Sequence, residues 1–103
     1  MANLMKLMQA AKKMQQNVEA TQEKLQTMRV TGADSSEIVS VETDGQHRCI
    51  QVKLSESAQT LERTILEEAI QSAINSTHEQ IQQLSQQEFS QIAEDIQRDT
   101  DSD

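Results

Sequence analysis

The sequence predicts an α+β fold in which a small antiparallel sheet lies between two long helices. Three observations favour it. Both glycines and most β-branched runs fall in the middle of the chain, the flanks carry apolar residues at helical spacing, and the chain contains no proline. We expect a helix at about residues 3–26, strands at about 27–32, 37–43 and 46–54, and a helix at about 58–97.

The size and composition of the chain predict an obligate oligomer. Only 35% of its 103 residues are hydrophobic, and Phe89 is the only aromatic residue. A chain this short buries a small fraction of its surface, and a core without aromatic rings buries little area per residue. We expect one domain over residues 1–98, followed by an acidic, disordered tail at 99–103.

The sequence favours a reducing compartment and no membrane span. Cys49 is the only cysteine, so the chain cannot form an internal disulfide. No apolar run approaches the roughly 20 residues that a spanning helix requires. The first residues, "MANLMKLMQAAKKMQQ", are periodic and lack the continuous apolar block of a signal peptide. We therefore expect a cytosolic protein.

The first predicted helix has an apolar stripe with near-heptad spacing. Its members are Leu4, Leu7, Ala11, Met14, Val18, Thr21, Leu25 and Met28. Steps of three and four residues place them on one face, which we interpret as core or dimer seam. The less favoured interpretation is a methionine-rich groove for a protein partner. Asn3 is the expected N-cap.

The central segment contains a hairpin signal at Asp44-Gly45. A two-residue type I′ turn there would require positive φ at both positions. It would pair Thr43 with Gln46, Val41 with Arg48, Val39 with Ile50 and Glu37 with Val52. This register predicts one apolar sheet face, formed by Val39, Val41, Ile50 and Val52, and a mixed face that includes Ile38, Ser40, Cys49 and Gln51. We expect helix to cover the apolar face, since an isolated hairpin is marginal in water.

The second predicted helix begins after "LSES", with Ser57 or Thr60 as its cap. Its apolar residues recur at helical spacing from Leu61 to Ile96. The low helix propensity of Asn75-Ser76-Thr77 predicts a bend there.

The two helical arms carry charge of opposite sign, within a net charge of −8. Residues 1–29 contain five basic and two acidic residues, a net charge of +3. Residues 55–103 contain eleven acidic residues against Arg63 and Arg98, a net charge of −9. The basic residues of the first arm and its continuation are Lys6, Lys12, Lys13, Lys24 and Arg29. They are the only concentrated positive charge in the chain.

Four segments follow one another along the chain: "NLMKLMQAAKKMQQNVEATQEKL", "VTG", "VSVETDGQHRCIQVKL" and "LEEAIQSAINSTHEQI". Taken in order, they resemble the YbaB/EbfC family of bacterial nucleoid-associated proteins, and the resemblance covers about residues 3–82. Within these, the matching positions are Val30-Thr31-Gly32, Val39, Val41, Gly45, Cys49, Val52 and the alanine-rich stretch that ends at Asn75.

The resemblance implies a homodimer whose helical arms project like tweezers and bind duplex DNA, with a role in nucleoid organisation or transcription. The family has no fixed residue code, so the DNA-binding candidates come from charge: Lys6, Lys12, Lys13, Lys24 and Arg29. The core and dimer candidates are Leu4, Leu7, Met14, Val18, Leu25, Val39, Val41, Ile50 and Val52. We prefer a seam formed jointly by the sheet and the base of the first helix.

The sequence departs from the family in two places. The loop after Gly32, "ADSSE", carries two acidic residues where glycines are usual. The second arm continues to about residue 97 with strongly acidic sequence, which duplex DNA repels.

Other functions are also compatible with the sequence. An acidic cytosolic adaptor or chaperone would use the methionine-rich helix to hold a client, and mimicry of DNA by the second arm would require a basic partner. An enzyme is least favoured, because no phosphate-binding glycine loop or nucleophile with a plausible base is present. We expect no cofactor and no metal: His47 should face Glu42 across the hairpin, Cys49 adds too few ligands for zinc, and His78 should lie on the surface.

Overall fold

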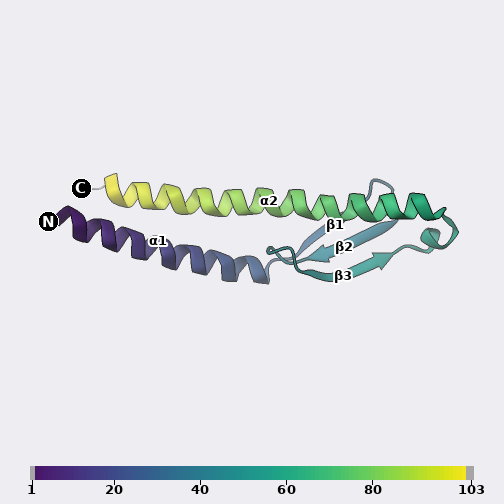
Figure 1. Cartoon of the computed structure of the whole chain (residues 1–103), viewed down its shortest axis with the longest axis horizontal. Coiled ribbons are helices and arrows are strands. Elements are labelled where there is room, and N and C mark those ends of the chain that lie inside the picture. Colours follow the sequence, from purple (N-terminus) through teal and green to yellow (C-terminus); the bar gives the residue numbers. More distant parts are fainter. Residues whose placement is uncertain (1, 102–103) are drawn as a thin grey trace.

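The protein is an elongated molecule with principal extents of 70 × 19 × 16 Å (Figure 1). The computed structural model describes residues 2–101. Its elements are α1 (Ala2–Thr27), β1 (Val30–Ala33), β2 (Val39–Thr43), β3 (Cys49–Leu54), the 3-10 helix η1 (Glu56–Thr60) and α2 (Arg63–Asp101). The predicted α+β order of helix, three-stranded antiparallel sheet and helix is confirmed.

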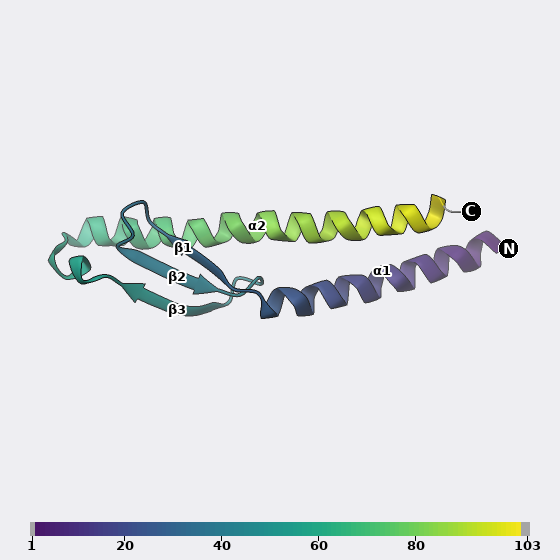
Figure 2. The same cartoon turned by 180° about the vertical axis from the view of Figure 1, so that it is seen from behind.

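The helix α2 runs along the length of the molecule. The sheet packs against its first half, and α1 lies beside its second half, so the start of α1 and the end of α2 are at the same end (Figures 1 and 2). The two views agree on this arrangement. The arms are therefore an antiparallel pair that extends away from the sheet.

The core lies between β2 and the first half of α2. Val39 and Val41 point from β2 onto Ala69 and Ala73, and all four residues are buried. The strand alternates buried and half-buried positions, as expected for a strand with one covered face. Small alanines on α2 allow the helix to approach the valines closely, so a core without aromatic rings can still exclude water.

Gly32 of β1 is required by this close approach. A Cβ built at Gly32 would lie 2.6 Å from both the carbonyl oxygen of Ala73 and the amide nitrogen of Thr77. Both atoms are helix backbone and cannot rotate away. The glycine of "VTG" therefore lets β1 pack directly on α2.

Asp34 closes the connection between β1 and β2. Its Oδ1 accepts a hydrogen bond of 2.8 Å from the backbone N–H of Val39, and its Oδ2 accepts one of 3.2 Å from Ser36. The hydrogen bond from Val39 lowers the pKa of Asp34 below its ordinary value of 3.8, because it stabilises the carboxylate. The "ADSSE" loop, which departs from the family, is thus ordered by its own aspartate.

The predicted two-residue turn at Asp44-Gly45 is wrong. The loop runs from Asp44 to Arg48, closed by a 3.0 Å hydrogen bond from the N–H of Asp44 to the carbonyl oxygen of Arg48. Asp44 Oδ1 accepts the N–H groups of Gln46 and Arg48 at 2.7 and 3.0 Å. The aspartate organises a longer loop, and positive φ occurs at His47 (71°) and not at Gly45.

The longer loop changes the register between β2 and β3. Val41 pairs with Val52 and Val39 with Leu54, and an irregularity between Glu42 and Thr43 leaves Thr43 opposite Cys49. Val39 and Val41 each pair with a residue four positions later in the chain than predicted. Because four is an even number, Val52 still lies on the predicted face of the sheet. Cys49, however, is opposite Thr43 and so shares the face of Val41, contrary to expectation.

The strand β3 is exposed along its whole length. Ile50, Val52 and Leu54 are 45%, 54% and 55% exposed. Ile50 and Val52 are therefore not core residues of a single chain, and their assignment as core or dimer residues stays a prediction for the dimer. The reason is that α2 covers β1 and β2, whereas β3 lies at the far edge of the sheet (Figure 1).

The apolar stripe of α1 is buried only near the sheet. Leu25 is buried and Val18 is half-buried, whereas Leu4, Leu7 and Met14 are 63%, 64% and 49% exposed. The last three are therefore not core residues of a single chain. The first half of the stripe has no covering surface among residues 2–101.

Several predicted element ends differ from the structure. Asn3 lies inside α1, which begins at Ala2, and is not its N-cap. Ser57 and Thr60 belong to η1, so neither caps α2. The helix α2 continues through Asn75–Thr77 and includes residues 99–101 of the expected tail, whereas residues 102 and 103 lie outside the described part of the chain.

Candidate nucleic-acid interface

The five basic candidates are all exposed, and four of them lie on α1. Lys6, Lys13 and Lys24 are separated by seven and eleven residues. On an α-helix both spacings return to within about 20° of the same direction, so these three positions share one stripe. They extend over roughly 27 Å at the rise of an α-helix.

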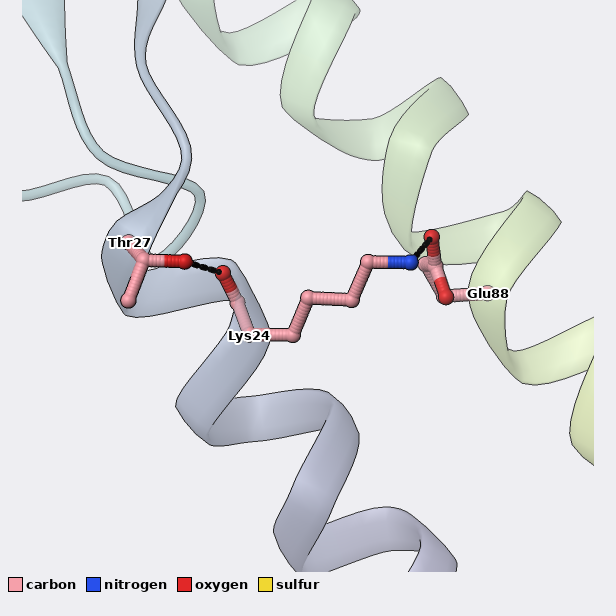
Figure 3. A network of polar contacts seen from close by, with 3 residues as sticks. All are labelled: Lys24, Thr27 and Glu88. Atoms are coloured by element: carbon pink, nitrogen blue, oxygen red, sulfur yellow. Dashed lines mark hydrogen bonds and ion pairs between the residues drawn. The ribbon is translucent and has the colours of Figure 1, made fainter.

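Lys24 shows that this stripe is directed toward α2. Its Nζ lies 2.9 Å from Oε1 of Glu88, 64 residues later in the chain (Figure 3). The carbonyl oxygen of Lys24 also accepts a 2.7 Å hydrogen bond from the hydroxyl of Thr27, which belongs to the last turn of α1. The ion pair thus links the two arms near the base of α1.

A cleft of about 260 Å³ lies between the arms beside this ion pair. It is lined by Asn17, Ala20, Thr21 and Lys24 of α1 and by Glu88, Gln91, Ile92 and Asp95 of α2. Lys13 is one helical turn before Asn17 on the same stripe, so the basic positions continue along the line of the cleft. Carboxylates of α2 supply its opposite wall.

Lys12 and Arg29 are placed differently. Lys12 is one residue, or about 100°, away from the stripe that includes Lys13. The guanidinium of Arg29 folds back on the end of α1, where Nη1 donates to the carbonyl oxygens of Gln26 (3.2 Å) and Met28 (2.9 Å). A cation at these last carbonyls stabilises the helix end. The structure therefore does not gather the five candidates into one cluster.

The helix α2 carries mainly acidic residues. Between residues 63 and 98 it has six carboxylates and two arginines. The arginines form local pairs, Arg63 with Glu67 at 3.0 Å and Arg98 with Asp95 at 3.2 Å. Three of the carboxylates, Glu88, Glu94 and Asp95, belong to the second half of α2, beside which α1 lies (Figure 1).

His47 contacts His78 and not Glu42 as expected. The two ring centroids are 5.2 Å apart, with 32° between the ring planes. His78 is exposed, as expected, and this contact places the β2–β3 loop beside α2. Within residues 2–101, no group of three or more His, Cys, Asp or Glu side chains is arranged to hold a metal ion.

The ion pair between Lys24 and Glu88 was not predicted from the amino-acid sequence. The opposite charges of the arms were the only sequence signal for it. Periodicity identifies the apolar face of each helix, but it does not say which residues of two distant helices become neighbours.

Neither helix, as far as the structure describes them, is long and apolar enough to cross a membrane.

Comparisons with known proteins agree with this architecture. Two curated relatives are nucleoid-associated proteins. The one from Legionella pneumophila (strain Corby) is 29% identical over 99 residues, which cover 96% of this chain and 88% of the relative. The one from Coxiella burnetii (strain Dugway 5J108-111) is 28% identical over 87 residues, which cover 84% and 79%.

A crystal structure of an uncharacterized protein from Helicobacter pylori has the same fold. It matches with a TM-score of 0.70 and 16% identity over 79% of this chain and 86% of that chain. The profile of the YbaB/EbfC DNA-binding family matches residues 1–96, which include both arms and the whole sheet. The chain therefore belongs to the YbaB/EbfC DNA-binding family.

Proposed function

We propose that this protein is a non-enzymatic, nucleoid-associated protein that binds duplex DNA as a homodimer through its helical arms. Its role would be in nucleoid organisation or transcription, within the bacterial cytoplasm. The observation that carries the proposal is the stripe of Lys6, Lys13 and Lys24 on α1, in a chain of a DNA-binding family. Lys12 and Arg29 add positive charge outside the stripe.

The length of the stripe suits a duplex backbone. Lys6 and Lys24 are about 27 Å apart along the helix, which corresponds to roughly eight base pairs. Because the chain has a net charge of −8, attraction to phosphate must be local to α1. DNA would therefore approach the basic side of α1 and avoid the outer face of α2.

The exposed strand β3 supports the homodimer. It is bonded only to β2 within the sheet, so its other edge is open, and its side chains Ile50, Val52 and Leu54 are about half exposed. An open edge with apolar side chains is a template for another strand. Pairing β3 with β3 of a second copy would bury these residues and leave both pairs of arms projecting from a common sheet.

Titration of a fluorescein-labelled random-sequence duplex, followed by anisotropy at several salt concentrations, tests DNA binding. The affinity should fall with salt, with a log–log slope of about −0.9 for each phosphate contact. The change of Lys6, Lys12 and Lys13 to Gln should weaken binding and make the slope less steep. Absence of binding by the unchanged protein at low salt would contradict the proposal.

A matched control separates local contacts from total charge. Gln82, Gln83 and Gln87 are exposed residues of α2, and their change to Glu removes the same three units of charge. We expect this variant to keep the salt slope of the unchanged protein. An equal loss in both triple variants would mean that net charge, and not the lysines of α1, controls the interaction.

A second candidate function is favoured by the exposed apolar residues of α1. Leu4, Met5, Leu7 and Met8 are each more than 60% exposed, which suits a protein-binding adaptor or chaperone that does not bind DNA. Such a protein would ignore the duplex at every salt concentration. It would instead lose a protein partner when Leu7 and Met8 are changed to Gln.

A further inference from the structure

Lys24 of α1 has an acidic partner on the opposite arm. Its ammonium lies 2.9 Å from the carboxylate of Glu88 (Figure 3). The side chain of Lys24 is 57% exposed, whereas that of Glu88 is only 23% exposed. The carboxylate is thus held at the contact between the arms, and the longer lysine reaches across to it.

We infer that Glu88 occupies Lys24 in place of a DNA phosphate and so limits the affinity of α1 for duplex DNA. The inference rests on the proposed function. A phosphate placed on Lys24 while Glu88 remains bonded would bring two anions to a single ammonium group. Their repulsion means that DNA has to displace the carboxylate before it gains this contact.

The cleft between the arms is the place where a phosphate would replace the carboxylate of Glu88 on Lys24. It lies directly beside the ion pair. Asp95, on the stripe of α2 that also contains Glu88, adds a second carboxylate to its wall. An exposed ion pair contributes little free energy, so the loss of this one phosphate contact lowers the affinity only modestly. Glu88 therefore adjusts the affinity of the protein and does not prevent binding.

The DNA-binding test compares Glu88→Gln with the unchanged protein. Removal of the carboxylate charge should raise the affinity at low salt by roughly two- to fivefold, the factor expected for an exposed ion pair. The salt slope should steepen by about 0.9, corresponding to one additional phosphate contact. In the Glu88→Gln background, Lys24→Gln should restore the original slope.

The matched control is Glu94→Gln, which removes the same charge from an exposed position of α2. It should leave the salt slope unchanged. If Glu88→Gln and Glu94→Gln have the same effect, the ion pair has no special role and the inference is wrong. It is also wrong if Lys24→Gln reduces the slope of the otherwise unchanged protein by one contact, since Lys24 would then already bind phosphate.

A measurement without DNA separates this inference from the proposed function. Acetic anhydride modifies lysine amines, and mass spectrometry of peptides reports the rate at Lys24 relative to exposed Lys12. Lys24 should react roughly two to five times faster in Glu88→Gln, with no change in Glu94→Gln. Equal rates in all three proteins would refute the role of Glu88. If Glu88 slows the acetylation of Lys24 but none of the three proteins binds DNA, the proposed function is wrong, and so is the effect of Glu88 on DNA affinity.

Discussion

The backbone N–H of Gly45 donates a 2.8 Å hydrogen bond to the carbonyl oxygen of Leu25. This contact joins the β2–β3 loop to the last turns of α1, so the angle at which the first arm leaves the sheet depends on it. Gln46 reinforces the junction, since its Nε2 donates to the carbonyl oxygen of Gln22 at 3.1 Å. The carbonyl oxygen of Leu25 has no partner four residues later within α1, and the hairpin loop supplies one.

Gly45→Ala should destabilise the protein by about 2 kcal/mol, because a Cβ at this position would lie 2.6 Å from the oxygen of Leu25. The urea midpoint, followed by circular dichroism at fixed protein concentration, measures the change. Ser35→Ala, in the exposed β1–β2 loop, should shift the midpoint little. An unchanged midpoint for Gly45→Ala would show that the loop can move away from α1 at no cost.

Ile81→Ala should be much more costly than the same change at Ile74. Ile81 is 2% exposed, whereas Ile74 on the same helix is 51% exposed. Truncation of a buried isoleucine leaves a cavity and costs about 3 kcal/mol, while the exposed site should lose less than about 1 kcal/mol. Urea denaturation of both variants checks the difference. Similar losses at both sites would indicate that Ile74 is covered in the assembled protein.

Asp34→Asn should remove part of the pH dependence of stability. The folded protein lowers the pKa of Asp34 below 3.8, so its contribution is present above that value and is lost as the pH falls through the folded pKa. The unchanged protein should therefore be more stable than Asp34→Asn at about pH 6, with a smaller difference near pH 2. Urea midpoints across this range provide the test. A difference that stays constant with pH would mean that the carboxylate charge is unimportant.

Val52→Lys combined with Leu54→Lys should convert the proposed dimer to monomers. Both side chains are more than half exposed on β3, and charges at the seam would be buried next to their own copies in the partner. Sedimentation velocity measures the state of association, and circular dichroism checks that the helices remain. Gln51→Lys, on the opposite face of the same strand, is the control. A double variant that still sediments as a dimer would place the seam elsewhere.

The order of the elements and the location of the core strand could be predicted from the amino-acid sequence alone. Periods of three to four residues in the flanks and of two residues around Val39 and Val41 report which face of each segment is apolar, and this information is local. The concentration of lysines on the first arm could also be recognised from the sequence, since charges are counted without a structure. Both glycines were likewise recognised as special positions. Gly45, however, is needed for the close approach of the loop to Leu25 and not for positive φ.

Which of these surfaces meet depends on the three-dimensional packing. The hydrogen bonds of Asp44 lengthened the hairpin loop and moved the register by four residues. The strand order β1-β2-β3 placed β3 at the edge of the sheet, where it is exposed. The antiparallel arrangement of the arms brought Lys24 to Glu88 across 64 residues. Such contacts depend on how the sheet packs against α2 and how the arms leave it. Helical period and charge describe one segment at a time, and the three-dimensional packing selects the neighbours.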